Sequence, residues 1–341
     1  MLDTDFRAAQ QSGPSEDFGG ARILVTGADG FMGSGLCERL LQQGSRVTAL
    51  VRRTSRSSIP GHVRNLLRIR DRLESIIQAD VAEADWYLAA QHIRPDIVFH
   101  LAADAFVPAG FTAPREVMRA NVGGTVSVLE FCRSLPTPPK LIVMSSSEVY
   151  GSHPAPIDEL VLPQPTTPYA ASKLAADRVS YSYAVSFGLP IVICRPFNTY
   201  GPRHPYDVIP RFLRAALTGA PIEIFGDGMQ SRDFMYIDDL VRGLCRVAAT
   251  PGLAREVINL GTGVSTSIRE LAELVVRVSG TDVPIVHLAP RQGEVLKLEC
   301  DASKAERLLD WRATVPLEAG LAACWEWTVR NKAFLLGTNE A

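Results

Sequence analysis

The sequence has no pair of cysteines at a metal-binding or redox spacing. Six cysteines are scattered over 341 residues, and none forms a Cys-x-x-Cys pair. Scattered cysteines within apolar segments are more typical of buried free thiols in a reducing compartment than of a disulfide framework or a zinc site. We therefore expect no structural metal and a cytoplasmic location. The six cysteines are Cys37, Cys132, Cys194, Cys245, Cys300 and Cys324.

Long apolar runs and an excess of one charge are also absent. No run is long enough to cross a bilayer, and the N-terminus lacks the basic and apolar segments of a secretory signal. The net charge of −2 gives no reason to expect nucleic acid or an anionic membrane as a partner. Residues 1–20 are rich in Ser, Gly, Asp, Glu and Gln, so we expect a disordered leader there.

From Arg22 onward, short apolar segments alternate with helical patterns. Fully apolar strands that alternate with helices predict an α/β fold with a parallel, doubly wound sheet of the Rossmann type. We expect strands at Ile23–Val25, Val47–Val51, Ser75–Gln78, Ile97–Leu101, Leu141–Ser145 and Pro190–Cys194. We expect helices near Asp85–His92, Arg115–Arg133 and Tyr169–Ser186.

The pattern changes after Arg195, where loops rich in Pro and Gly separate shorter helices. A composition with 46% hydrophobic residues is sufficient for a sizeable core. We expect residues 21–197 to form the cofactor-binding domain. Residues 198–335 then form mainly a smaller, mixed α/β substrate lobe.

Three glycines follow the first expected strand at the spacing Gly-x-x-Gly-x-x-Gly. In a strand-to-helix turn, Gly27 permits the tight turn, Gly30 lets the backbone approach a pyrophosphate, and Gly33 lets helix and strand pack closely. The N-terminus of the helix then offers N–H groups to the phosphates. This context favours a dinucleotide site over a merely tight turn.

The second strand lacks the acidic residue that would bind the ribose of NAD. A carboxylate about 20 residues after the glycines usually bonds the 2′-hydroxyl, but Arg52 and Arg53 follow Val51 here. Guanidinium groups suit a 2′-phosphate. The sequence therefore leans toward NADP over NAD, and the alternative is a solvated basic loop.

Tyr169 and Lys173 have the spacing Tyr-x-x-x-Lys, which puts both side chains on one face of a helix. A tyrosine with its ordinary pKa near 10 is a poor base at neutral pH. A neighbouring ammonium and the positive nicotinamide would lower this pKa. Tyr169 would then take a proton from a sugar hydroxyl while hydride leaves for the cofactor.

Several segments resemble an extended short-chain dehydrogenase/reductase of the nucleotide-sugar epimerase/dehydratase family. The resemblance spans about residues 21–332 and implies a tightly held, recycled NAD(P), a nucleotide-diphosphate sugar as substrate, and a homodimer packed through the helices of Asn121 and Tyr169. The matching segments are Thr26–Gly33, Phe99–Ala103, Asn121–Thr125, Ser145–Gly151, Pro168–Lys173, Arg195–Arg203, Arg232–Asp239 and Ile258–Gly263.

The resemblance implies that Glu148 separates members that eliminate water from those that only epimerise, whereas glucuronate decarboxylases can also carry a hydroxyl residue followed by Glu. The resemblance implies that members which eliminate water between C5 and C6 carry Glu here, since a carboxylate can remove the C5 proton once C4 is a ketone. Ser146 would bond the C4 oxygen, while Ser147 replaces an aspartic acid found in many dehydratases. We therefore expect a nucleotide-sugar 4,6-dehydratase. A 4-epimerase and a glucuronate decarboxylase remain alternatives.

Two further alternatives stay open. A binding-only Rossmann protein is disfavoured because Tyr169, Lys173, Ser146 and Glu148 are all present. A reductase of 4-keto sugars that consumes NADPH remains possible because of Arg52 and Arg53.

The resemblance also implies the remaining site residues. Asn198, Arg232 and Arg291 would contact the diphosphate and nucleoside, and Phe225 and Tyr236 would pack near the base or sugar. The expected cofactor-binding residues are Gly27, Gly30, Phe31, Met32, Gly33, Arg52, Arg53, Asp80, Val81, Leu101, Ala102, Ala103, Asn121, Tyr169 and Lys173.

Overall fold

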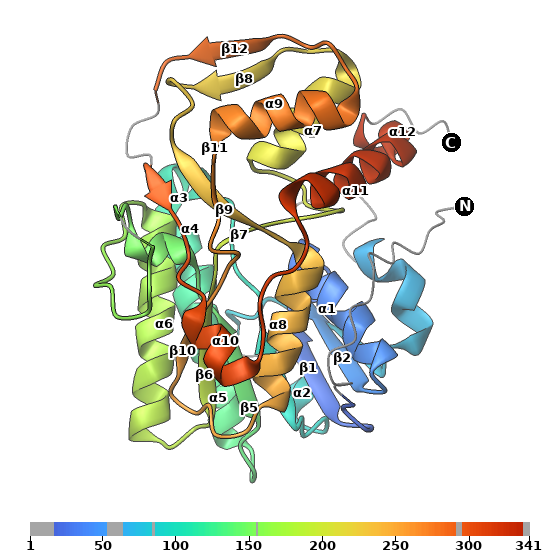
Figure 1. Ribbon diagram of the computed structural model, residues 1–341. Helices are drawn as coiled ribbons and strands as arrows, with labels where there is room; N and C mark the ends of the chain where they lie inside the picture. The colour runs from blue at the N-terminus through green and yellow to red at the C-terminus, as the bar shows by residue number, and fades with distance from the viewer. Residues whose placement is uncertain (1–16, 53–63, 84–85, 155, 291–294, 337–341) are drawn as a thin grey trace.

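The computed structural model describes residues 17–52, 64–83, 86–154, 156–290 and 295–336 (Figure 1). A seven-stranded parallel sheet has the order β10-β6-β5-β4-β1-β2-β3, and the fold class predicted from the sequence is confirmed. The strands are β1 (Arg22–Thr26), β2 (Arg46–Val51), β3 (Ser75–Gln78), β4 (Ile97–His100), β5 (Lys140–Met144), β6 (Ile191–Pro196) and β10 (Val257–Leu260).

The six expected strands are all present, with ends that differ by at most two residues. The seventh strand, β10, was not expected. It lies in the chain after residue 197 and pairs with β6, so the chain returns to the large sheet from the second lobe. β10 is as short as β3 and β4, and its place beside β6 depends on how the second half of the chain folds back rather than on a local pattern.

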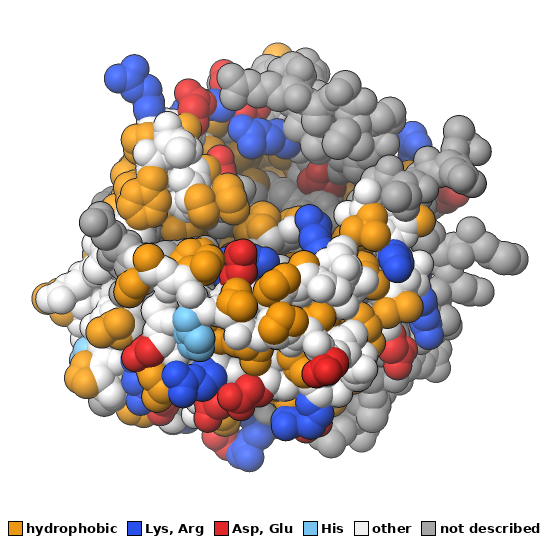
Figure 2. Space-filling model, turned by 90° about the horizontal axis from the view of Figure 1, so that it is seen from above, with side chains coloured by type: hydrophobic (Ala, Val, Ile, Leu, Met, Phe, Trp, Pro, Cys, Tyr) orange, Lys and Arg blue, Asp and Glu red, His pale blue; other side chains and the backbone are white. Residues whose placement is uncertain are grey.

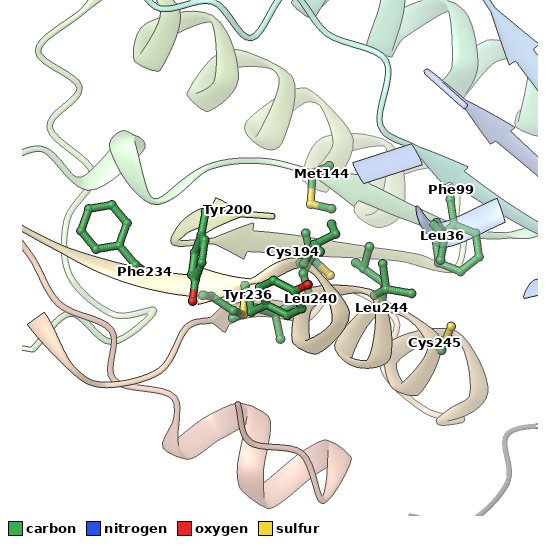
Figure 3. Close-up of a cluster of buried hydrophobic side chains, with 14 of the residues drawn as sticks. Leu36, Phe99, Met144, Cys194, Tyr200, Phe234, Tyr236, Leu240, Leu244 and Cys245 are labelled. Carbon is green, nitrogen blue, oxygen red and sulfur yellow. The ribbon is translucent and has the colours of Figure 1, made fainter. Parts of the chain in front are cut away.

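Helices cover both faces of this sheet because its strands are apolar on both sides. Ile23 and Val25 pack into the core beneath α1 (Phe31–Gln42) and α8 (Ile237–Ala249), whereas Leu24 packs into the opposite core. Figure 3 shows the first core, where Leu36, Leu240 and Leu244 of the two helices meet strand residues. The opposite face carries α2 (Trp86–Ala90), α5 (Gly124–Ser134) and α6 (Pro168–Ser186).

The expected helix at Arg115–Arg133 is present, but it is interrupted. Helix α4 (Pro114–Met118) is followed by a π-helical turn, η2 (Arg119–Gly123), before α5 begins. Such turns are frequent at functional sites, and this one carries Asn121. The other short helical segments are α3 (Ala109–Thr112) and two 3₁₀ helices, η1 (Arg64–Arg72) and η3 (Ser147–Tyr150).

The second lobe lies at the top of Figure 1. Its central strand, β9 (Ser231–Tyr236), pairs with β7 (Asn198–Tyr200), β11 (Ser265–Ser267) and β13 (Lys297–Leu298). A separate parallel pair joins β8 (Ile222–Phe225) to β12 (Ile285–Leu288). Seen from above, this face of the molecule is hollowed beside a group of hydrophobic side chains (Figure 2). The helices of this lobe are α7 (Val208–Thr218), α9 (Ile268–Ser279), α11 (Leu317–Arg330) and α12 (Lys332–Leu335), whereas α10 (Ser303–Leu309) lies lower, beside β10 of the large sheet (Figure 1).

The expected leader needs one correction. Residues 1–16 lie outside the described residues, but residues 17–20 form an ordered turn against the domain. Phe18 N–H donates to the Gln43 carbonyl at 3.3 Å, Gly20 N–H donates to the Gly44 carbonyl at 3.1 Å, and Phe18 packs on the core. These contacts hold the segment that leads into β1.

The six cysteines are free and buried, as expected. Within the described ranges, no helix combines the length and the apolar character needed to cross a membrane. Likewise, no three His, Cys, Asp or Glu side chains of the described residues come together as metal ligands would.

Candidate active site

The glycine loop after β1 leaves room for a dinucleotide because side chains are absent there. Gly27 has a φ of +68°, and a Cβ on it would lie 2.8 Å from the amide nitrogen of Ala102. A Cβ on Gly33 would lie 2.2 Å from the carbonyl oxygen of Gly27. Gly30 is the N-cap of α1 and forms no side-chain cap, so the first turn keeps N–H groups for a phosphate. The loop therefore fits a pyrophosphate.

Phe31 and Met32 begin α1 directly after this loop. The Phe31 ring stacks on His204 with centroids 4.5 Å apart and an interplanar angle of 13°, while Met32 packs against the core. Arg203 forms an ion pair with Glu38 of α1 at 2.7 Å. The loop after β7 is thus attached to the phosphate loop.

Asp80 and Val81 lie after β3, where the adenosine end of a dinucleotide is expected. The Asp80 carboxylate accepts from Ala82 N–H at 3.0 Å and pairs with Arg119 at 2.9 Å. Burial alone would raise the pKa of Asp80, but these hydrogen bonds and the charge of Arg52 keep it below its usual value. Asp80 is therefore an ionised acceptor beside Arg52. Arg53 lies outside the described residues.

Val81 and the segment Leu101–Ala103 follow β3 and β4 at the same edge of the sheet as the glycine loop and supply apolar side chains there. A Cβ on Gly124 would lie 2.8 Å from Cγ1 of Val81, so the start of α5 packs tightly on this residue. Leu101, Ala102 and Ala103 are half-buried after β4. Ala102 N–H donates to the Thr26 hydroxyl at 3.1 Å, which joins the ends of β1 and β4.

Asn121 is buried in the π-helical turn and links two loops of the site. Its Oδ1 accepts from Asp104 N–H at 2.7 Å, and its Nδ2 donates to the Asp104 carbonyl at 3.1 Å and to Ser172 Oγ at 2.8 Å. Ser172 in turn donates to the carbonyl of Tyr169 at 2.6 Å. The side chain of Asn121 therefore positions the start of α6 rather than facing open solvent.

Tyr169 and Lys173 lie on the buried face of α6, as the spacing predicts. Thr167 caps this helix by accepting from Ala170 N–H at 3.1 Å. Burial and the charge of Glu148 raise the pKa of Tyr169, and a hydrogen bond with Ser146 opposes the rise.

Lys173 contacts the sheet directly. Its Nζ donates to the carbonyl of Met144 at the end of β5, and burial lowers its own pKa to about 8. The ammonium therefore links α6 to β5 on the buried side of the helix, and its effect on the Tyr169 phenol stays a prediction.

Glu148 follows β5 in the 3₁₀ turn η3, whose N-cap is Ser146. The Ser146 hydroxyl accepts from Glu148 N–H at 3.2 Å, which fixes the turn. The Glu148 side chain is half-buried, and burial raises its pKa, an effect opposed by the charge of Arg232. Ser147 is buried within the same turn. Residues from β5, α6 and β9 thus converge around Glu148.

Two of the residues expected to bind substrate lie in β7 and β9 of the second lobe. Asn198 begins β7, and its buried Oδ1 has no hydrogen-bond partner among the described residues. Arg232 donates to the Ser231 carbonyl at 2.8 Å and acts electrostatically on Glu148. A buried, unpaired amide oxygen is costly unless a ligand or water satisfies it.

The other three expected residues have different outcomes. Phe225 ends β8 and lies under the Arg211 guanidinium, 5.1 Å from its ring centroid. Arg291 lies outside the described residues. Tyr236 was placed near the substrate, but the structure puts it in the core with 2% of its surface exposed, edge-on to Tyr200 (Figure 3). Its ring is used for packing.

Sequence reasoning missed a buried polar cluster beneath the catalytic turn. Asp177 accepts from Ser145 at 3.0 Å and from Arg195 Nε at 2.8 Å, and Arg195 donates to the Tyr150 hydroxyl at 2.8 Å. Asp177 follows Lys173 by four residues on the same face of α6. That spacing was the available signal, and it shows that the buried face of this helix is polar.

The glycine loop, the buried Tyr169–Lys173 pair and the ionised Asp80 are arranged as a dinucleotide-dependent enzyme would need them. Residues 23–261 match the model of the NAD dependent epimerase/dehydratase family. The chain therefore belongs to this family, which acts on nucleotide sugars in the relatives described next.

The UDP-glucose 4-epimerase of Mycolicibacterium smegmatis is 35% identical over 320 residues, which cover 92% of this chain and 99% of that protein. The structure of UDP-glucuronic acid 4-epimerase from Bacillus cereus, in complex with UDP-glucuronic acid and NAD, gives a TM-score of 0.84 at 34% identity and covers 90% of this chain and 99% of that one. The dTDP-glucose 4,6-dehydratase of Streptomyces venezuelae, with NAD bound, gives a TM-score of 0.84 at 31% identity and covers 92% and 98%.

These structures bear on the cofactor. Both neighbours hold NAD, so the expected preference for NADP has no support from them. The family is NAD-dependent.

Proposed function

We propose that the protein is a nucleotide-sugar 4,6-dehydratase. The observation that carries the proposal is the position of Glu148, a half-buried carboxylate that acts electrostatically on Tyr169 and is itself acted on by Arg232. The family resemblance implies that members which only epimerise tend to have a small or apolar residue at this place. A dehydratase needs a base there to remove the proton at C5.

The first step is oxidation at C4. NAD, when bound, accepts the hydride from C4, later returns it to C6, and brings a positive charge that lowers the pKa of Tyr169. The Tyr169 phenol takes the proton of the C4 hydroxyl, and Ser146 holds the oxygen beside it. Lys173 keeps the helix and the end of β5 in register through its bond to the Met144 carbonyl.

The second step is elimination. Glu148 removes the proton from C5, the C6–O bond breaks, and the same proton leaves with the C6 hydroxyl as water. A carboxyl group whose pKa is raised by burial suits this exchange, since it must accept a proton and release it again. Ser147 carries no acidic proton, so Glu148 performs both roles. The proton that C5 finally receives balances the one that Tyr169 took from the C4 hydroxyl, and C6 receives the hydride taken from C4, so the net change is the redox-neutral loss of one water.

We assign Asn198 and Arg232 to the diphosphate of the substrate, with Phe225 and Arg211 beside the nucleoside. The unpaired Oδ1 of Asn198 supports a polar ligand at β7, and a guanidinium at Arg232 suits a phosphate. Arg291 belongs to the same proposal from its sequence position. We assign NAD as the recycled cofactor, on the NAD in the neighbouring structures.

We also propose a homodimer through α5 and α6. Helix α6 exposes Tyr181 and Val185 at 40% and 49%, and its C-cap residue Phe187 is 53% exposed. This is apolar surface that a partner would cover. Multi-angle light scattering should give twice the chain mass, and V185E with F187E should give the monomer mass. A wild-type monomer would contradict the assembly.

The deciding experiment measures product mass. The purified enzyme with catalytic NAD is incubated with UDP-, dTDP-, GDP- and CDP-hexoses and with a UDP-glucuronate. Loss of one water from one sugar supports the proposal. Unchanged mass with inverted C4 makes the protein a 4-epimerase, the second candidate favoured by the epimerase relatives, and loss of carbon dioxide makes it a decarboxylase. A need for stoichiometric NADPH would indicate a reductase.

Two variants separate the steps. Y169F should abolish reduction of the bound cofactor. E148Q should still allow oxidation but block the loss of water, whereas the control E223Q, at an exposed position in β8, should leave both unchanged. An E148Q enzyme that loses water at the normal rate would contradict the role of Glu148.

A further inference from the structure

We propose that His100 is a positioning residue that couples the end of β1, where the dinucleotide loop begins, to the Tyr169 helix through one continuous chain of hydrogen bonds. The proposal rests on the oxidation role assigned to Tyr169 above. It does not depend on whether the later step is dehydration, epimerisation or decarboxylation.

The first half of the chain runs from the cofactor segment to the imidazole. Ala102 N–H donates to the Thr26 hydroxyl oxygen at 3.1 Å. The single hydrogen of that hydroxyl is then directed to Nδ1 of His100, 2.8 Å away. A Cβ on Gly27 would touch Ala102, so this chain begins at the backbone that lies against the dinucleotide loop.

The second half runs from the imidazole to the π-helical turn. The Thr125 hydroxyl donates to the Asn121 carbonyl at 2.6 Å. Its oxygen therefore accepts from His100 Nε2–H at 3.0 Å. With Nδ1 as acceptor and Nε2 as donor, every atom in the chain has one role, and the imidazole is neutral with its hydrogen on Nε2.

The charge environment agrees with this tautomer. His100 is 3% exposed, and burial, helped by the charge of Lys173, lowers its pKa to about 3. A protonated ring would place a second N–H on the side of Thr26 and a positive charge near Lys173. Burial and the neighbouring charge therefore both favour the neutral form at neutral pH.

The chain then reaches the catalytic helix. The side chain of Asn121 donates to Ser172, and Ser172 donates to the Tyr169 carbonyl. Five side chains thus connect the cofactor loop to the backbone of the residue that takes the proton. Networks of this kind strengthen cooperatively in a buried site, and a small displacement of a catalytic group is costly to the rate.

A plain structural role is the competing explanation, and Thr48 provides the matched control. Thr48 is a buried threonine of β2 in the large sheet, and its hydroxyl bonds Ser75 at 3.1 Å. It takes no part in the chain of hydrogen bonds described above. T125V and T48V remove the same group at similar burial. If His100 and Thr125 only stabilise the fold, both variants should behave alike.

The measurement is the single-turnover reduction of bound NAD on addition of the substrate found above, together with steady-state kcat and KM and the melting temperature. T125V should lower the reduction rate by about 10- to 100-fold at unchanged KM and NAD affinity, while T48V should retain the wild-type rate at a similar melting temperature. H100Q, which keeps a donor toward Thr125, should recover more of this rate than H100N. Equal rates for T125V and T48V would overturn the proposal.

A second readout needs no turnover. Long-range 1H–15N spectra of histidine-labelled protein, with H100Q to assign the signal, should show the neutral Nε2–H tautomer between pH 6 and pH 8. An Nδ1–H tautomer or a protonated ring would overturn the proposal. If no nucleotide sugar reduces the cofactor, the proposed function fails, and these spectra still test the chain.

Discussion

The cofactor loop and the second lobe are held in shape by different means. Between Gly27 and Gly33 the chain depends on absent side chains, since a Cβ at either glycine would meet backbone atoms within 3 Å. Backbone contacts of this kind cannot relax by a change of rotamer. The shape of this loop therefore depends on the space that the two glycines leave free.

The second lobe depends instead on a few buried carboxylates. Asp233 of β9 accepts from Thr262 N–H at 2.9 Å, from Gly263 N–H at 2.8 Å and from Cys300 N–H at 3.2 Å. Asp239 of α8, the helix that packs on the large sheet beside this lobe, holds the C-terminal part of the chain in the same way by accepting from Thr314 and Val315. These partners lie far along the chain. The shape of the second lobe therefore depends on hydrogen bonds between segments that are distant in the chain.

The largest effect is expected from G33A. The added methyl group would lie 2.2 Å from the Gly27 carbonyl, so the loop must move, with a cost of about 3 kcal/mol or more in the free energy of unfolding. NAD binding by calorimetry should be lost. The control is G35A in the same helix, where the new Cβ meets only side chains of α8 at 3.6 Å, and it should be neutral or slightly stabilising. A G33A protein that is stable and active would show that the loop does not depend on the space left at Gly33.

D233N should have the next largest effect, and in the other region. The amide would turn one N–H₂ group toward backbone donors that now bond a carboxylate, with an expected loss of about 3 kcal/mol. Denaturant unfolding should show this loss, while NAD affinity should stay close to that of the wild type. D227N, at an exposed carboxylate that caps only Met229 N–H, should cost less than about 1 kcal/mol. Equal losses of stability in D233N and D227N would show that the buried carboxylate contributes no more to the second lobe than an exposed one.

This difference also explains what the sequence could predict. The glycines, Tyr169, Lys173 and Glu148 act within short stretches, so their spacing alone indicated the loop, the helix and the turn. The role of Asp233 depends on residues up to 67 positions away, and no local pattern reveals it. Tyr236 was assigned wrongly for the same reason, because Gly320 of the distant helix α11 closes over its ring.

The π-helical turn and β10 were missed on other grounds. A π-helical turn differs from an α-helix by one residue in its hydrogen bonds, and the apolar pattern of Arg115–Arg133 does not record it. The turn is explained only by the hydrogen bonds of Asn121, because its side chain contacts Asp104 and Ser172. Propensity thus located the elements of the fold, whereas the polar contacts across the sheet required coordinates.

A smaller effect is expected where the two regions meet, at Arg232 and Glu148. Burial raises the Glu148 pKa and the Arg232 charge lowers it, so R232Q should raise it further. Because Glu148 must be ionised to take the C5 proton, the acid limb of the pH profile should move to higher pH. R269Q, at an exposed arginine of α9, should leave the limb in place. An unmoved limb in R232Q would place Glu148 outside the influence of the second lobe.

The smallest effect is expected beside Asp80, where the adenosine end of the cofactor is expected to lie. Here the affinity for the cofactor should depend on charge rather than on the space that glycines leave. Arg52 is exposed, and its charge helps to keep Asp80 ionised. Exposed charges contribute about 1 kcal/mol or less, so R52A should change NAD affinity by less than about fivefold. A loss confined to NADP would mean that Arg52 bonds a 2′-phosphate and that both cofactors are accepted. A large loss of NAD affinity would instead mean that side chains, and not only glycines, determine the fit of the cofactor region.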